Sequence, residues 1–272
     1  FLNMRHTLPK SPQFYVTAPQ DCPYLADQVE RKLFTALYGS NSRRLNNSLS
    51  KQVFRRSQNV LYRPSCSNCN ACMSARISSM KFEPSKSQKR VLLKNSDITR
   101  VVNPPLATDS QYDLFKRYIN TRHPNGGMSD MDADDFTAMI EETNVESKII
   151  EYYVNKNGTL ELISFSLVDI LDDGISMIYS VFDPNMKERS LGTYMIIDHN
   201  DLALEMKLKF VYLGYWVKGS SKMDYKIRFT PLELFTNDKW VCAGNSDNQK
   251  IDINEGVQKY NATAPIYLPL EE

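Results

Sequence analysis

The segment from residue 148 to residue 182 alternates apolar and polar side chains with a period of two. The alternating runs are 148–155, 159–169 and 175–182. Asn157-Gly158 separates the first two runs, and Asp172-Asp173-Gly174 separates the second from the third. Asn-Gly between two such runs is a strong signal for a two-residue hairpin. The sequence therefore predicts three antiparallel strands joined by tight turns.

The patterns on either side of these strands set the order of the remaining elements. Helical spacing of apolar residues predicts two helices before the strands, at 109–122 and 132–142, and a longer helix after them, at about 191–207. The apolar run 210–216 then reads as a fourth strand, which should lie parallel to the third. This is the element order of the acetyltransferase-like fold, so we expect an α+β chain with a GNAT-type C-terminal domain.

Charge is distributed unevenly along the chain. Residues 1–100 contain 17 Lys and Arg against 5 Asp and Glu, whereas residues 101–272 contain 16 against 27, so the overall net charge is only +1. The segment 101–108, which contains Pro104-Pro105, reads as a linker. We therefore predict a smaller basic, cysteine-containing N-terminal domain over 1–105, the acetyltransferase-like domain over 106–240 and a C-terminal tail over 241–272.

The basic N-terminal part indicates a polyanionic partner. Neutralisation of phosphates by Lys and Arg drives association with nucleic acids, although scattered lysines can also serve only to solvate a surface. A helix opened by a capping box at Ser85 and Gln88 presents the basic side chains that are the predicted nucleic-acid contacts. These are Lys86, Lys89, Arg90 and Lys94. Another helix is expected over 44–56, ending in the pair Arg55-Arg56.

Four cysteines are candidate metal ligands. Cys66, Cys69 and Cys72 follow one another at C-x-x-C-x-x-C spacing, and Cys22 is the only other cysteine in the N-terminal third. Thiols at this spacing can converge on a soft metal, so the four are candidate ligands of an iron-sulfur cluster or of zinc. The alternative is that they are reduced thiols with a packing role.

Cysteine number and hydropathy bear on location. The five cysteines are an odd number, and the chain opens with no charged-then-apolar signal segment. A disulfide framework is therefore not expected, and we predict a reducing, cytoplasmic location. No apolar run approaches the roughly 20 residues that would span a bilayer, so no membrane partner is expected.

The turn before the long helix gives a check on the donor. Acetyltransferases of this fold carry an Arg/Gln-x-x-Gly-x-Gly/Ala turn whose backbone N–H groups hold the pyrophosphate of coenzyme A. Here the turn reads Arg189-Ser-Leu-Gly192-Thr-Tyr194, and Tyr194 stands where a small residue would let phosphate approach the backbone. We therefore expect an acyl donor other than acetyl-CoA. An aminoacyl ester carried on tRNA would also suit the basic domain.

Longer stretches of the chain resemble one family. In order between Phe14 and Trp240, the chain contains FYVTAPQDCPYL, FRRSQNVLYRP ahead of CSNCNAC, NGGMSDMD, SMIYSVFDP, RSLGTYMIIDH and YLGYWVKGSSKMDYKIRFTPLE. Together these resemble the arginyl-tRNA protein transferase family, in its bacterial aspartate/glutamate leucyltransferase branch. The resemblance implies transfer of leucine from leucyl-tRNA to the N-terminal amine of proteins that begin with Asp or Glu, which marks them for degradation in the N-degron pathway. The arginyl branch transfers arginine to similar acceptors.

The resemblance also bears on cofactors. In eukaryotic members the N-terminal region is implicated in cluster or metal binding through cysteine pairs of a different spacing. This chain reads Cys22-Pro-Tyr24 where a second cysteine would complete such a pair. The transfer itself requires no cofactor, because an aminoacyl ester is already activated and a protein α-amine has a pKa near 7.7 to 8.0.

Hydroxyl groups on the third and fourth strands are the candidate catalytic groups. In this fold the acyl group lies where those strands splay apart, and hydroxyls there can donate to the oxyanion or relay protons. The candidates are Tyr179, Ser180, Tyr212 and Tyr215, and packing is the alternative role for each. His199, beside Asp198, is a further acid-base candidate, with a structural role in its helix as the alternative.

An acidic first residue of the acceptor calls for a cationic pocket. The candidates for binding substrate are Arg55, Arg56 and Arg76, which flank the cysteine loop, and Lys222, Lys226 and Arg228, which follow the fourth strand. One group would hold the acceptor and the other the tRNA phosphates, unless both are solvated surface charges.

Two other functions fit parts of this pattern. A coenzyme A dependent N-acetyltransferase would bind acetyl-CoA despite Tyr194. A non-catalytic, metal-stabilised RNA-binding protein would bind tRNA whether or not it were charged. The expected partners remain aminoacyl-tRNA and proteins with N-terminal Asp or Glu, with leucine or arginine as the transferred group.

Overall fold

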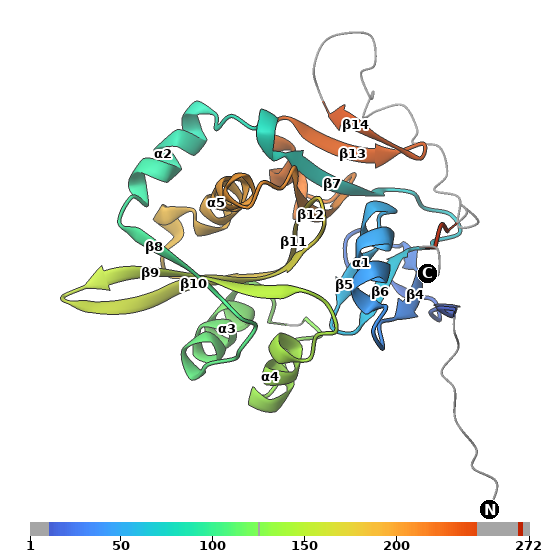
Figure 1. The fold of residues 1–272 in the computed structure, drawn as a ribbon, viewed down its shortest axis with the longest axis horizontal. Helices are drawn as coiled ribbons and strands as arrows, with labels where there is room; N and C mark the ends of the chain where they lie inside the picture. Colours follow the sequence, from blue (N-terminus) through green and yellow to red (C-terminus); the bar gives the residue numbers. More distant parts are fainter. Residues whose placement is uncertain (1–10, 125, 244–265, 269–272) are drawn as a thin grey trace, which may run out of the picture.

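The three predicted strands form the centre of a large sheet (Figure 1). In the computed structural model, which describes residues 11–124, 126–243 and 266–268, they are β9 (Ser147–Lys156), β10 (Thr159–Ile170) and β11 (Gly174–Phe182). Neighbouring strands pair antiparallel. Asn157 and Gly158 have φ of 54° and 88°, the positive values that a type I′ turn needs at both central positions, so the hairpin prediction is confirmed.

Helices cover both faces of this meander in the predicted order. The helices α3 (Asp109–Arg122) and α4 (Ala133–Glu141) pack on one face, each opened by a capping box (Figure 1). On the other face lies α5 (Leu191–Glu205), which leads to β12 (Phe210–Val217), parallel to β11. The predicted α+β, acetyltransferase-like order of elements is therefore confirmed.

The large sheet also recruits strands from earlier and later in the chain. These are β7 (Cys72–Ser78), β8 (Ile98–Asn103), β13 (Leu232–Thr236) and β14 (Lys239–Ala243). The order is β14-β13-β7-β12-β11-β10-β9-β8, and α2 (Lys86–Lys94) packs beside α5. The domain division at residue 105 stays a prediction, but β7 and β8 precede that residue and belong to the large sheet.

Two segments that were predicted to be a linker and a tail contribute residues to this sheet. The linker predicted over 101–108 is wrong at its start, because residues 101–103 belong to β8 and pair with β9. Of the tail predicted over 241–272, residues 241–243 end β14 and 266–268 are described, whereas the rest lies outside the described residues.

A small sheet, of order β1-β4-β6-β5, lies beside one end of the large sheet (Figure 1). Its strands are β1 (Phe14–Val16), β4 (Lys32–Ala36), β5 (Arg55–Ser57) and β6 (Val60–Pro64). A separate pair consists of β2 (Gln20–Asp21) and β3 (Val29–Glu30), and the short 3-10 helices are η1 (Ser79–Lys81), η2 (Lys187–Arg189) and η3 (Asp224–Arg228). No helix of the described residues has both the length and the apolar character needed to cross a membrane.

The helix predicted over 44–56 is shorter than expected. It is α1 (Ser42–Lys51), and it ends because Val53 takes the left-handed φ of 68°. The chain then turns into β5, so the prediction that Arg55 and Arg56 end a helix is wrong. The reason is not local, because the two guanidinium groups bind partners in the large sheet that lie 122 and 113 residues further along the chain.

Candidate active site

The site lies where β11 and β12 part. The two strands pair over only three residues each, ending at Ser176 and Tyr212, and both strands continue beyond that point. The register of β12 shifts between Tyr212 and Gly214, whose φ is 81°, a left-handed value that glycine adopts at no steric cost. The strands therefore diverge beyond Ser176 and Tyr212, which leaves an opening in their hydrogen-bond ladder that side chains from other elements enter.

Two cations enter this opening. Arg55 of β5 donates from Nη2 to the carbonyl of Met177 at 2.8 Å, and Lys226 of η3 donates from Nζ to the carbonyl of Tyr215 at 2.6 Å. Both carbonyls lie beyond the last β11–β12 pair, so the cations satisfy backbone acceptors that this ladder does not reach. A Cβ atom placed on Gly214 would lie 3.6 Å from Nε and Nη2 of Arg55 and 3.7 Å from Nζ of Lys226. Both cations therefore flank one point above the backbone of β12.

The opening carries positive charge that its own residues do not neutralise. Arg55 is 6% exposed and Lys226 is 4% exposed, and neither forms an ion pair within the part of the chain that the structure describes. Burial, together with the neighbouring Arg55 charge, lowers the pKa of Lys226 to about 7. Burial also lowers the pKa of Arg55. An anion entering here would meet two desolvated donors.

Two of the four predicted catalytic hydroxyls lie on the side of the small sheet. The hydroxyl of Tyr179 forms a hydrogen bond of 3.0 Å with that of Ser57 in β5. The hydroxyl of Tyr215 donates to the carbonyl of Val53 at 2.7 Å and lies 3.2 Å from the carbonyl of Tyr62. Tyr179 thus has a hydroxyl partner that can reorient, whereas Tyr215 ties β12 to two backbone carbonyls.

The structure does not bring the other two predicted hydroxyls to this place. Tyr212 donates to the carboxylate of Asp173 at 3.1 Å and accepts from Nη1 of Arg76 at 3.4 Å. The hydroxyl of Ser180 pairs with that of Ser166 at 3.1 Å, and Ser166 in turn contacts a methionine of α5. The four candidates therefore do not converge, because alternate residues of a strand face opposite sides and β12 shifts register at Gly214.

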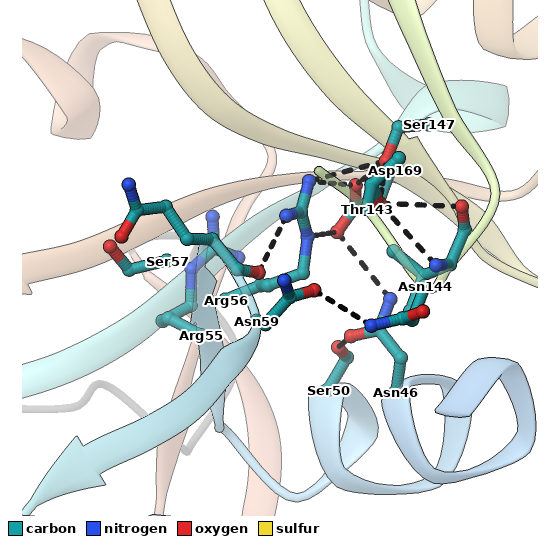
Figure 2. Close-up of polar contacts among 12 residues, drawn as sticks. Asn46, Ser50, Arg55, Arg56, Ser57, Asn59, Thr143, Asn144, Ser147 and Asp169 are labelled. Carbon is teal, nitrogen blue, oxygen red and sulfur yellow. Dashed lines mark hydrogen bonds and ion pairs between the residues drawn. The ribbon is translucent and has the colours of Figure 1, made fainter. Parts of the chain in front are cut away.

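Arg56, a predicted substrate-binding residue, is instead part of a buried network between the sheets (Figure 2). Its Nε and Nη2 donate to the two carboxylate oxygens of Asp169 at 2.6 and 2.7 Å. The same carboxylate accepts from Ser147 at 2.8 Å and from Asn46 at 3.4 Å. Arg56 is 5% exposed and Asp169 is 1% exposed. This guanidinium is therefore buried in an ion pair that links β5 to β10 and does not face the opening.

The remaining predicted substrate cations are dispersed. Arg76 forms an ion pair with Glu233 at 2.7 Å, and its guanidinium lies 3.6 Å from the ring centroid of Phe210. Lys222 and Arg228 are exposed before and at the end of η3, while Lys226 between them is buried. Of the six predicted substrate cations, the structure brings only Arg55 and Lys226 together at the opening.

The basic face of α2 forms as predicted. Ser85 and Gln88 make the capping box that opens the helix, and Gln88 is buried. The four predicted nucleic-acid contacts are exposed: Lys86, Lys89, Arg90 and Lys94. Their role in binding tRNA stays a prediction.

The turn before α5 is occupied by internal contacts. Arg189 donates from Nη1 and Nη2 to Asp97 at 2.8 and 2.9 Å. A Cβ atom on Gly192 would lie 3.3 Å from the ring of Phe182, so that ring covers the glycine. Tyr194, 8% exposed, packs edge-on against another tyrosine. The side chains of Arg189 and Tyr194 are thus engaged within the protein, and the ring of Phe182 lies over Gly192.

The four candidate cysteine ligands line one cavity, together with residues of the β2–β3 pair and with Tyr215. Burial, reinforced by the other three thiols, raises the pKa of Cys72 to about 12, and burial also raises the pKa of Cys66. No three His, Cys, Asp or Glu side chains among the described residues are grouped closely enough to hold one metal ion. The donor types suit a soft metal, but this arrangement is not a ligand shell, and metal binding stays a prediction.

His199 is fully buried in α5. Its Nδ1 hydrogen-bonds the carbonyl of Met195 one turn earlier in the helix, and burial lowers its pKa. Its neighbour Asp198 accepts from Arg100 and from the hydroxyl of Tyr152. The structure therefore favours the structural alternative for His199 over an acid-base role.

Sequence reasoning missed Gly214, Ser57 and Tyr62. Gly214 had a readable signal, because an isolated glycine within the apolar run 210–217 indicates a bulge or a close approach. Ser57 and Tyr62 had none, since they enter the site only through the docking of the small sheet.

Comparison with known proteins places the chain in a family. A family model described as "Arginine-tRNA-protein transferase, N terminus" matches residues 20–90, and its counterpart for the C terminus matches residues 110–236. Among solved structures, the C-terminal domain of a putative lysylphosphatidylglycerol synthetase from Agrobacterium fabrum aligns over 63% of this chain and 58% of that one, with 12% identity and a TM-score of 0.45. A likeness of that degree is too remote to speak about function.

Similar full-length relatives are bacterial. A protein of Ruegeria pomeroyi named "Aspartate/glutamate leucyltransferase" is 59% identical over 87% of this chain and 86% of its own length. A protein of Paracoccus denitrificans with the same name is 52% identical over 92% of both chains. With both family models and relatives of this similarity spanning most of its length, the chain belongs to the arginine-tRNA-protein transferase family.

Proposed function

We propose that this protein transfers leucine from leucyl-tRNA to the α-amine of proteins whose first residue is Asp or Glu. The observation that carries the proposal is the name of the relatives, which are 52–59% identical over most of both chains and are named aspartate/glutamate leucyltransferases. The uncompensated charge of Arg55 and Lys226 supports it, because an acidic acceptor needs a cationic pocket.

The chemistry needs no nucleophile from the protein. The acceptor amine attacks the ester carbonyl, the C–N bond forms as the bond to the ribose oxygen breaks, and the amine proton passes to that oxygen. Alignment of amine and ester supplies much of the rate. A hydroxyl donor aimed at the tetrahedral oxyanion adds roughly 2.7 to 4 kcal/mol.

Tyr179 is the candidate for that donor. Its hydroxyl is bound to the hydroxyl of Ser57, so it can turn toward an oxyanion without leaving a buried acceptor unpaired. We expect Tyr179→Phe to lower kcat roughly 100-fold, the loss of one such donor. Tyr212→Phe is the matched control, because its hydroxyl is held by Asp173 and Arg76. Equal losses in the two variants would remove Tyr179 from this role.

A transfer assay tests the function itself. Purified protein is given leucyl-tRNA or arginyl-tRNA with peptides that begin with Asp, Glu, Lys or Ala. We expect leucine transfer to the Asp and Glu peptides only. Arginine transfer to the same acceptors would assign the other branch of the family, and transfer from neither donor would overturn the proposal.

A further inference from the structure

Arg55 and Lys226 are buried cations, and neither has a counterion among the residues that the structure describes. Burying a guanidinium or an ammonium away from water is costly unless an opposite charge accompanies it. The neighbouring Arg56 obeys this rule, since Asp169 lies against it. Arg55 and Lys226 form no ion pair within residues 11–124, 126–243 and 266–268, so no carboxylate of those residues balances the two charges.

Backbone carbonyls occupy only some of the N–H donors of Arg55 and Lys226. A guanidinium has five N–H donors and an ammonium has three. The hydrogen bonds found for them in the described part of the chain use one carbonyl each, those of Met177 and Tyr215. These bonds fix the positions of both cations at the two parted strands and leave further donors for a ligand.

Gly214 provides the space that both cations face. An atom at the position of a Cβ on Gly214 would lie within 3.7 Å of nitrogen atoms of both Arg55 and Lys226. Outside Gly214 and its two chain neighbours, these nitrogens are the three nearest heavy atoms to that position. A carboxylate oxygen close to that point would lie near both cations at once, and a side chain at residue 214 would compete with it.

We propose that Arg55, Lys226 and the backbone at Gly214 form the pocket that binds the side-chain carboxylate of the acceptor's first residue. This assignment rests on the proposed function, because it locates the recognition of Asp and Glu within that reaction. An RNA phosphate is the less fitting ligand. Phosphates of nucleic acids are met mainly by exposed cations, which α2 offers, whereas Arg55 and Lys226 are only 6% and 4% exposed.

Lys226→Met tests the pocket while keeping the length of the side chain. The variant removes a buried charge, which favours folding, and takes a donor from the carbonyl of Tyr215, which opposes it, so urea unfolding first checks that it folds. Kinetics of leucine transfer are measured with peptides that differ only in beginning with Asp or Asn. We expect KM for the Asp peptide to rise roughly 30-fold, which corresponds to about 2 kcal/mol, the lower end for removing one partner of a buried charge pair.

Three further measurements keep the interpretation specific. KM for leucyl-tRNA and the kinetics with the Asn peptide should stay unchanged in Lys226→Met. Gly214→Ala places a methyl group beside both cations without changing charge but also strains the left-handed backbone, so urea unfolding first checks that it folds; its preference for Asp over Asn should then fall in the same way. Lys156→Met at the exposed β9–β10 turn should leave every parameter unchanged.

The outcomes separate this proposal from the proposed function. If wild type transfers leucine but Lys226→Met keeps the Asp preference, the function stands and the pocket is refuted. A rise in KM for leucyl-tRNA alone would assign the cations to an RNA phosphate and refute it as well. If wild type transfers nothing, direct binding of the two labelled peptides decides: an Asp preference lost in Lys226→Met supports the pocket, and no preference in wild type overturns it.

Discussion

Replacing Asp169 with asparagine removes one charge from a buried ion pair that joins the two sheets. The carboxylate lies on β10 of the large sheet and accepts two hydrogen bonds from Arg56 on β5 of the small sheet, at 2.6 and 2.7 Å (Figure 2). Ser147 and Asn46 complete its hydrogen bonds. The variant keeps the shape of the side chain and leaves the guanidinium buried without a counterion.

The expected loss is large relative to the whole stability of the protein. Breaking a buried pair by removing one partner costs about 3 to 5 kcal/mol, whereas native proteins have about 5 to 15 kcal/mol in total. At about 2 to 4 °C per kcal/mol for a chain of this size, the melting temperature should fall by roughly 6 to 20 °C. Since β5 also carries Arg55, leucine transfer should become sensitive to mild heating.

Urea unfolding measures the change in unfolding free energy, and two other variants serve as comparisons. Asp172→Asn removes an exposed carboxylate whose nearest cation, Lys51, is 3.9 Å away, and surface pairs contribute only about 0 to 1 kcal/mol. The double variant Arg56→Met with Asp169→Leu removes both charges and should be more stable than Asp169→Asn alone. A cost below about 1 kcal/mol for Asp169→Asn would refute the view that this pair holds the sheets together.

Other perturbations follow from burial and exposure. Burial lowers the pKa of Lys226 to about 7 from an unfolded value near 10.5, so wild type should gain stability as pH rises between these values and Lys226→Met should not. If urea unfolding gave wild type and Lys226→Met the same change in unfolding free energy between pH 7 and pH 9, this would be contradicted. In chelator-treated protein at pH 7.5, iodoacetamide should label exposed Cys242 well before Cys72, whose pKa is about 12. Mass spectrometry measures the labelling of each cysteine, and equal labelling rates would contradict the prediction. Lys89→Ala should make the plot of log association constant for tRNA against log salt concentration less steep by roughly 0.9. The control Lys156→Ala should keep the wild-type slope. A wild-type slope for Lys89→Ala would exclude a phosphate contact by Lys89.

The elements that could be predicted are those specified by neighbouring residues. Asn157-Gly158 sets the β9–β10 turn through its own backbone preferences, and the capping boxes at the starts of α2 and α3 each need only four consecutive residues. The parallel β12 followed from the helix that separates it from β11. Local chemistry therefore predicted the order of the large sheet's central elements.

The candidate site was predicted only in part, because its geometry depends on distant contacts. Residues 222–228 allowed a helix or a strand, and neither pattern indicated that Lys226 is buried while Lys222 and Arg228 are exposed. Arg55 and Arg56 are adjacent in sequence, yet one faces the opening at β12 and the other faces Asp169. Which arginine meets a substrate is decided by how the small sheet docks on the large one.

Under the proposals above, the anion-binding place of this scaffold differs from that of acetyltransferases. In acetyltransferases of this fold, backbone N–H groups at the start of the long helix hold a pyrophosphate. Here the side chain of Arg189 is bound by Asp97, and the ring of Phe182 lies over Gly192 at that start. Arg55 and Lys226, which pair with no carboxylate of the described residues, lie instead beside Gly214, on the strand after the helix. Under the proposed function, Arg55 and Lys226 then bind the carboxylate of the acceptor and not the phosphates of the donor. The phosphates of a tRNA donor are bound by exposed cations such as those of α2.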